Sequence, residues 1–248
     1  MDKQYELKYH RLEENYWWFR ARRDIIFRLL RQLDVSYSSK IIDLGCSGGR
    51  LIDFLRKKGF RNISGIDISR EAIIECKKRG IKDTFVRNCI NTKFKNKEFD
   101  ILIASDILEH IETDSEAMRE WNRILKTDGI LIVFVPAFNF LWSKHDEVNH
   151  HYRRYSQVKL ANDLKKHKFR ILKISYWNFS LFIPVSFIRI IQHFTPEKHK
   201  VNGDQLFQLP YMVNKALTCL LEMENRLLEK ALIYPYGLSV FAVAKKVN

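Results

Sequence analysis

The chain has 248 residues, enough for one large α/β domain, and shows neither an internal repeat nor a Pro- or Gly-rich linker, so we expect a single domain over residues 1–248. Its net charge of +14 attracts RNA, anionic lipid and phosphorylated metabolites alike and does not choose among them. Four cysteines without Cys-x-x-Cys spacing argue against a disulfide framework and a cysteine zinc site.

The N-terminal region predicts a helix rather than a signal peptide. Its first residues are charged and lack an apolar stretch, so the expected localisation is cytoplasmic. Apolar and aromatic positions recur every three or four residues over 5–33, which predicts a helical N-terminal cap over residues 1–36. Trp17 and Trp18 beside Arg20 are suited to close over a cofactor and pair with its carboxylate, although plain core packing fits the rings equally well.

After this cap the pattern alternates between strands and helices. Strands are expected near residues 40–44, 62–67, 82–87, 99–104, 129–135, 170–177 and 238–245. Helices are expected between them, near residues 48–59, 69–79, 114–126, 156–167 and 212–232. Such alternation predicts an α/β protein with a doubly wound, mostly parallel sheet covered by helices on both faces.

The first expected strand runs into a glycine-rich turn. Residues 40–49 read Lys-Ile-Ile-Asp-Leu-Gly-Cys-Ser-Gly-Gly, and Asp67 ends the second expected strand. Gly45 and Gly49 carry no Cβ, so the backbone can pass close to a ligand and positive φ is freely available. A carboxylate at a strand end can accept both hydroxyls of a ribose. Because the glycines do not follow the Gly-x-Gly-x-x-Gly of a dinucleotide site, the pattern predicts a nucleoside cofactor without a pyrophosphate.

This turn resembles the first motif of the class I S-adenosylmethionine-dependent methyltransferases. Later motifs of that family follow in order and at family spacing, and they are Phe85 to Cys89, Glu98 to Ile103, Asp106 to Ile111 and Arg123 to Gly129. The resemblance covers about residues 15–178 and returns at the last strand. It implies S-adenosyl-L-methionine as cofactor and a Rossmann-like, seven-stranded sheet with an N-terminal helix and a helical insertion before an antiparallel last strand.

The resemblance also implies roles for individual residues. Gly45 and Gly49 would approach the methionine part of the cofactor, and Asp67 would bind its ribose. The whole set of expected cofactor-binding residues is Asp43, Gly45, Cys46, Gly49, Asp67, Ile68, Asn88, Cys89, Ser105 and Arg20. Ser47 departs from the glycine that is commonest in the family. Asn88 departs from a frequent aspartate at the adenine, so it keeps an acceptor oxygen and loses the charge.

The segment after the fifth strand, residues 136–155, is rich in aromatic and titratable side chains. It leaves the carboxyl end of a strand, where ligands bind in a doubly wound sheet. His145, Asp146 and His150 offer base chemistry near neutral pH. We therefore expect His145, His150 and Asp106, which follows the fourth strand, to be the catalytic residues.

No metal is expected from the spacing of these groups. The histidines at positions 145, 150 and 151 match no zinc signature. Asp106, Glu109 and His110 resemble a cluster in metal-dependent O-methyltransferases of quinone pathways. The same Leu-Glu-His-Ile sequence is common in metal-free members of the family, where the histidine packs and caps a helix.

A helical insertion over residues 179–235 separates the last two strands and is longer than an ordinary connection. It begins with an apolar run that Arg189 interrupts and that is shorter than the about 20 residues of a membrane span. A lid over the pocket, a dimer contact and a peripheral helix at the inner membrane face are the alternatives, of which the lid is favoured.

The function expected from these features is S-adenosylmethionine-dependent methyl transfer, most readily to oxygen, on a small-molecule acceptor or one linked to lipid or saccharide. RNA methylation is the first alternative, supported by the net charge but by no Asn-Pro-Pro-Tyr-like motif or RNA-binding module, so nucleic acid is not the expected partner. A non-catalytic protein that keeps the fold is the second, and an NAD-dependent oxidoreductase is a distant third. Oligomeric state is not predicted.

Overall fold

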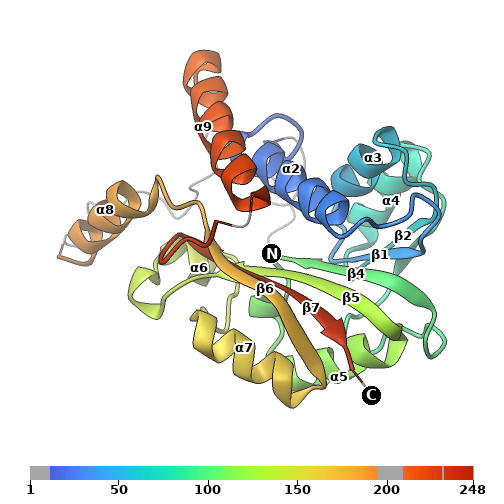
Figure 1. The fold of residues 1–248 in the computed structure, drawn as a ribbon. Helices are drawn as coiled ribbons and strands as arrows, with labels where there is room; N and C mark the ends of the chain where they lie inside the picture. Colours follow the sequence, from blue (N-terminus) through green and yellow to red (C-terminus); the bar gives the residue numbers. More distant parts are fainter. Residues whose placement is uncertain (1–11, 195–208, 231, 248) are drawn as a thin grey trace.

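The structure, a computed structural model, describes residues 12–194, 209–230 and 232–247. Seven strands form one sheet in the order β3-β2-β1-β4-β5-β7-β6 (Figure 1). The pairs among β1 to β5 are parallel, and β7 runs antiparallel to both β5 and β6. The strands are β1 (Ile41–Leu44), β2 (Ile63–Asp67), β3 (Thr84–Val86), β4 (Phe99–Ser105), β5 (Leu125–Pro136), β6 (Phe169–Trp177) and β7 (Ser239–Lys246). The predicted doubly wound, mostly parallel seven-stranded sheet is confirmed.

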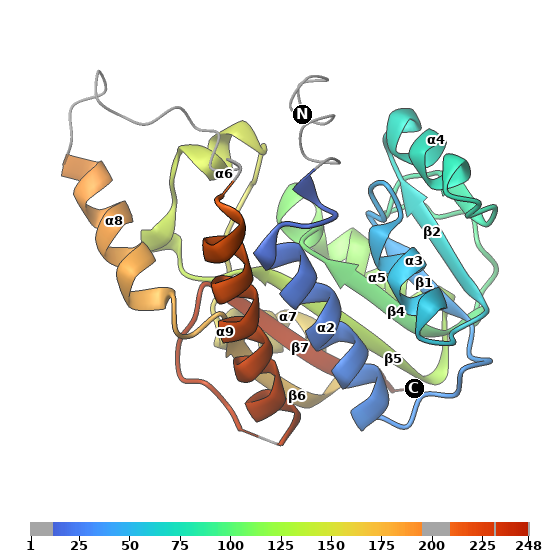
Figure 2. The same ribbon diagram turned by 90° about the horizontal axis from the view of Figure 1, so that it is seen from above.

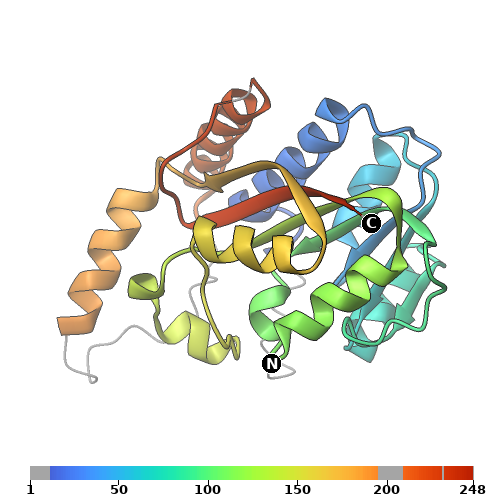
Figure 3. The ribbon, with the colours of Figure 1, turned by 60° about the horizontal axis from the view of Figure 1, so that its bottom comes forward.

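Helices cover both faces of this sheet. One face carries α2, α3 and α9, while α5 and α7 (green and yellow) cross the other (Figures 1 and 3). The helices of the described residues are α2 (Trp17–Gln32), α3 (Arg50–Lys57), α4 (Arg70–Lys78), α5 (Asp114–Ile124), α6 (Lys144–Val148), α7 (Gln157–Lys166), α8 (Phe182–Phe194) and α9 (Tyr211–Glu229), with the short 3-10 turns η1 (Leu108–His110) and η2 (Asn139–Leu141). Among these residues, none of the helices is both long enough and apolar enough to cross a bilayer.

The central strands are apolar on both faces because helices bury both faces. Residues 131–135 of β5 and residues 101–104 of β4 are all buried, and they form the middle of the hydrophobic core. Trp121 of α5 and Trp177 of β6 are its largest fully buried side chains. A sheet supported on both faces in this way holds its strand ends at fixed positions.

Two elements differ from the sequence prediction. The helix expected over 5–33 is interrupted, because residues 13–15 form a turn and α2 begins at Trp17, while residues 1–11 lie outside the described part. Asn214 of α9 accepts the Trp17 backbone N–H through Oδ1 at 2.8 Å, so a partner from another helix fixes the start of α2. Strand β5 begins at Leu125 instead of residue 129, because an irregularity in the ladder lets Leu125 pair with Phe99.

Helix α2 of the N-terminal cap packs on helix α9 of the insertion, although the two are distant in sequence. Helix α2 lies alongside α9 on the same face of the sheet (Figure 2). Asn225 of α9 is fully buried at this joint and donates through Nδ2 to the Ala21 carbonyl at 2.8 Å and to Asp24 Oδ2 at 2.9 Å. Its Oδ1 accepts from Trp177 Nε1 at 2.8 Å. One amide therefore joins α2, α9 and β6.

We expect Asn225→Ala to lower the free energy of unfolding by about 1–3 kcal/mol, because buried groups of α2 and β6 lose their Asn225 partner. Urea denaturation followed by circular dichroism measures this change. Met223→Ala on the same helix is the control, since Met223 is 62% exposed and its loss should have little effect. Equal stability of the two variants would contradict the bridging role.

Candidate functional site

The carboxyl ends of β1 and β4 meet at a small cavity. Connections from β1 and β4 leave toward opposite edges of the sheet, so this is the switch point at which open α/β sheets bind ligands. The cavity measures about 90 Å³, and its lining includes Asp43, Gly45, Ser105 and Asp106 from the strand ends and Arg22 from α2. The structure thus brings together expected cofactor-binding residues and the expected catalytic Asp106 from two strand ends, and adds Arg22, which the sequence analysis did not include.

The glycine-rich turn needs its glycines for packing as well as for φ. Gly45 has φ +69°, and a Cβ there would lie 2.8 Å from the Ile107 side chain. Gly49 has φ +77° at the start of α3, where a Cβ would lie 2.9 Å from Cys76 Sγ. Both positions are therefore closed to larger residues. The turn brings Cys46 to the cavity wall and holds α3 against α4.

Asp67 is held at the end of β2 by two backbone donors. Ser47 N–H donates to its Oδ2 and Ser69 N–H to its Oδ1, each at 2.9 Å. These contacts fix the carboxylate beside the turn, at the strand end where the sequence predicts ribose binding.

Arg22 supplies the buried cation of the cavity. Its guanidinium lies 4.1 Å from the ring centroids of Phe134 and Trp177, and NH2 lies 3.4 Å from Asp106 Oδ1. Burial raises the pKa of Asp106 even though Arg22 acts in the opposite direction. Ser105 donates through Oγ to the other Asp106 oxygen at 2.8 Å. These contacts hold the Arg22 side chain in the cavity wall, close to the strand ends.

The remaining expected cofactor residues lie outside the lining of this cavity. Ile68 is 74% exposed next to Asp67, which leaves an apolar surface free to lie against a ring. Asn88 is exposed and its Oδ1 accepts from the Ile90 N–H, whereas Cys89 is buried with its pKa raised by burial to about 12. Arg20 is exposed on α2. The helix periodicity turns the neighbouring Arg22 inward instead.

Glu13 lines the cavity next to the glycine-rich turn. Ser47 donates through Oγ to Glu13 Oε2 at 3.1 Å. Burial, followed by the charge of Glu13, raises the pKa of Asp43 well above its ordinary value. Ligand pockets usually enclose about 300–1,000 Å³. The cavity of about 90 Å³ is therefore smaller than a nucleoside cofactor needs.

The loop after β5 is built around the buried carboxylate of Asp146. Arg154 donates from Nε to Oδ1 at 2.8 Å and from NH2 to Oδ2 at 3.0 Å, and Ser143 N–H donates to Oδ2 at 2.9 Å. His151 Nδ1 lies 2.8 Å from Oδ1. Burial alone would raise the pKa of Asp146, but His151 and Arg154 hold it below its ordinary value. The loop therefore carries a fixed negative charge at its centre.

The Asp146 contacts make His151 a catalytic candidate, although the sequence analysis favoured His145 and His150. His150 is exposed with φ +54°, and burial lowers the pKa of His145 to about 4. His151, by contrast, is oriented by Asp146 and close enough to affect the charge of Asp106. The spacing of Asp146 and His151 carried no recognisable signal, since their contact depends on the turn between them.

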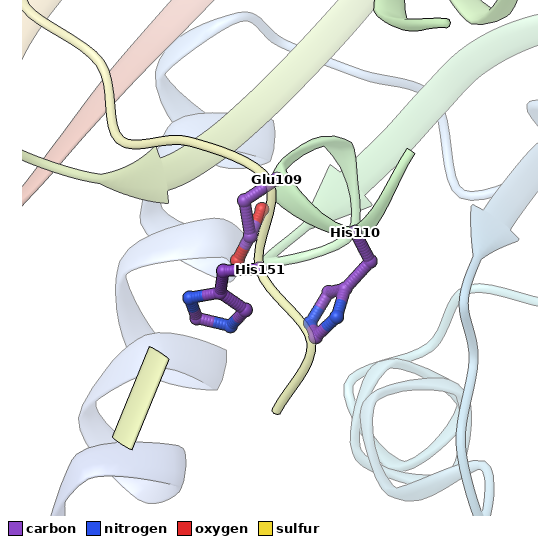
Figure 4. Close-up of side chains that lie close together, drawn as sticks. All are labelled: Glu109, His110 and His151. Atoms are coloured by element: carbon purple, nitrogen blue, oxygen red, sulfur yellow. The ribbon is translucent and has the colours of Figure 1, made fainter. Parts of the chain in front are cut away.

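His151 meets two residues of η1, the turn that follows β4. Glu109, His110 and His151 place their ligand-type atoms within 4.8 Å of one another, and Figure 4 shows the three side chains converging from two segments. Burial, followed by the charge of Asp106, raises the pKa of Glu109 well above its ordinary value. Burial lowers the pKa of His110 to about 3. We refer to these three residues as the Glu-His-His cluster, and it is a candidate both for proton transfer and for holding a cation.

The fold and the strand-end carboxylate define a nucleoside-cofactor-binding α/β domain, and comparison with known proteins identifies it further. A family model described as a methyltransferase domain matches residues 42–133. The ubiquinone biosynthesis O-methyltransferase of Saccharomyces cerevisiae mitochondria is 35% identical over 108 residues, covering 41% of this chain and 35% of that protein. An uncharacterised protein of Methanocaldococcus jannaschii is 31% identical over 175 residues, covering 70% and 60%.

Among solved structures, an S-adenosylmethionine-dependent methyltransferase of Archaeoglobus fulgidus superimposes with a TM-score of 0.57 at 19% identity, covering 96% of this chain and 99% of that one. The class I S-adenosylmethionine-dependent methyltransferase domain that the motifs predicted is confirmed over the matched residues 42–133, and the shared fold extends over most of the chain. S-adenosyl-L-methionine is the cofactor of such domains. The chain spans between about a third and three-fifths of the length of the two curated relatives described above.

Replacing Asp67 tests the cofactor site. Charge-assisted hydrogen bonds are worth about 1.5–3 kcal/mol each, so Asp67→Asn should weaken the binding of S-adenosylhomocysteine at least tenfold. Isothermal calorimetry measures the affinity. Asp83→Asn is the control, because the Asp83 side chain is 67% exposed before β3. Unchanged affinity in Asp67→Asn would remove Asp67 from the site.

Proposed function

We propose that the protein transfers the methyl group of S-adenosylmethionine to an oxygen of a small-molecule acceptor or of one linked to lipid or saccharide. The observation that carries this proposal is the Glu-His-His cluster, which lies close to Asp106, a residue of the cofactor cavity lining. A hydroxyl acceptor has to lose its proton, and an oriented imidazole beside a carboxyl group meets that need.

The reaction is an in-line displacement at the methyl carbon. A new O–C bond forms while the C–S bond breaks, its electron pair returns to sulfur, and neutral S-adenosylhomocysteine leaves. The acceptor proton passes to the cluster and then to water. The protein therefore has to align the acceptor, exclude water from the methyl group and favour the positive sulfonium. The carboxylates of Asp43, Asp67 and Asp106 around the cavity suit that charge.

The similarity to a ubiquinone biosynthesis O-methyltransferase supports oxygen as the acceptor atom, although it covers 41% of this chain. The net charge favours RNA methylation, but no arrangement of the described residues supports it. A non-catalytic role would not require an oriented His151 or a buried Glu109 at the cavity edge. Methylation of oxygen is therefore the function that best fits the site.

Replacing His151 tests this function. We expect His151→Ala to lower kcat by about 10² to 10⁴ with little change in cofactor affinity, because the acceptor would lose the group that prepares its oxygen. The assay follows label from S-adenosylmethionine into lipid, small-molecule and RNA fractions of a cell extract. His150→Ala is the comparison, since the exposed His150 has no place in this arrangement. Label in RNA alone would overturn the proposal.

The outer face of α8 supports an acceptor that is presented by a lipid surface. This helix contacts η2 on one side, where Arg189 is buried and donates to the Leu141 carbonyl. On the other side Ile183 and Phe187 are 66% and 65% exposed, and Figure 1 shows the helix extending away from the sheet. No described residue of α8 lines the cofactor cavity, so the geometry favours surface contact over the lid expected from sequence.

Vesicle sedimentation tests this contact. We expect binding that increases with the content of anionic lipid, because the chain carries a net charge of +14. Phe187→Asp should weaken binding by about tenfold or more, since inserting a phenylalanine side chain is worth about 1.5–3 kcal/mol. Val158→Asp on α7 is the control, because Val158 is 69% exposed on another part of the surface. No binding by the wild type would exclude a lipid-facing role for α8.

A further inference from the structure

Glu109 is a buried carboxylate that lacks a compensating partner. It is 1% exposed, and its Oε2 has no hydrogen-bond partner among the described residues. The nearby cations are already engaged, because Arg22 faces Asp106 and Arg154 binds Asp146. A buried charge without a partner is expensive, so a site of this kind needs either a proton or a positive ion.

The two histidines beside Glu109 each have one ring nitrogen held in place. His151 has Nδ1 engaged with Asp146 Oδ1 at 2.8 Å, which leaves Nε2 available. The His110 ring bonds to the backbone of Asn149, which leaves its other nitrogen available. The two rings meet edge to face with centroids 4.5 Å apart. Metal-binding histidines typically have one nitrogen fixed in this manner by a carboxylate or a carbonyl while the other binds the ion.

From this convergence we infer that Glu109, His110 and His151 bind one divalent transition-metal ion, with Zn²⁺ as the best match. Two imidazole nitrogens and one carboxylate oxygen form a ligand set that suits zinc and its neighbours, whereas Mg²⁺ prefers oxygen alone. A tetrahedral ion with bonds of about 2.1 Å needs ligand atoms about 3.4 Å apart. The ligand atoms lie within 4.8 Å of one another, so side-chain rotation has to bring them closer when an ion binds.

This ligand set differs from the sequence cluster of Asp106, Glu109 and His110. Asp106 precedes Glu109 on the same segment, but Arg22 and Ser105 already engage both of its oxygens. The third ligand comes instead from His151 in the loop after β5. The spacing along the chain predicts no metal because this ligand arrives from a different element.

Three protein ligands leave a coordination position open, as in catalytic zinc sites. An acceptor oxygen bound there would lose its proton more readily, since a zinc ion lowers the pKa of a bound water to about 7. This role rests on the proposed function, but ion binding itself does not. The two statements can therefore fail separately.

The test uses the full-length protein after treatment with a chelator. We expect calorimetric titration with ZnCl₂ to give one ion per chain, and CoCl₂ to give the visible absorption of a low-coordinate Co²⁺ site. Glu109→Gln and His151→Gln should each weaken Zn²⁺ binding at least about tenfold, and Asp146→Asn by about 10- to 100-fold through His151. Glu147→Gln, an exposed carboxylate on α6, is the control and should match the wild type.

Circular dichroism checks that each variant is folded. If Asp146→Asn does not fold, Glu109→Gln still decides the test. Equal Zn²⁺ affinity in the wild type, Glu109→Gln and His151→Gln would overturn the inference, as would no binding at micromolar Zn²⁺ or a preference for Mg²⁺. Full oxygen methylation by a protein that binds no metal would leave the proposed function standing and remove the ion. Binding of one Zn²⁺ per chain, with label found only on nitrogen acceptors, would support the ion site and overturn the proposed oxygen methylation.

Discussion

The active-site side of this molecule depends on one buried carboxylate, that of Asp146. It is fully buried, and two nitrogens of Arg154, the ring of His151 and the N–H of Ser143 all point at its two oxygens. Removing one partner of such a buried pair typically costs about 3–5 kcal/mol, because the other charge is left uncompensated. The loop after β5 is therefore held as one unit, and the orientation of His151 follows from the same contacts that stabilise the loop.

A second buried pair, Arg22 with Asp106, performs the corresponding task on the cofactor side. Aromatic rings enclose the guanidinium, so the cation stays near the strand ends without being surrounded by water. The two pairs together explain why the pKa of Glu109 is raised. Arg22 already pairs with Asp106 and Arg154 with Asp146, so neither forms an ion pair with Glu109. The carboxylate of Glu109 therefore has to take up a proton or bind a positive ligand.

The sheet and the cofactor turn were predictable because their signals are local. Apolar strands, the positive-φ Gly45 and the strand-end Asp67 act within a few residues of one another. The choice among His145, His150 and His151 was not predictable, since it depends on which ring reaches Asp146 after the chain has turned. Arg20 and Arg22 differ for a similar reason, namely the rotation of α2, and Asn214 fixes the start of that helix from a distant part of the chain.

The joint between α2 and α9 bears on how the protein is made. Arg28 of α2 pairs with Glu229 of α9, and the two residues are 201 positions apart in the chain. A nascent chain emerges from the ribosome N-terminal end first, at about 5–20 residues per second. Helix α2 thus waits at least ten seconds, by that rate, for the helix that completes its packing. The cofactor cavity, which α2 helps to line, consequently takes its final form only after α9 has been synthesised.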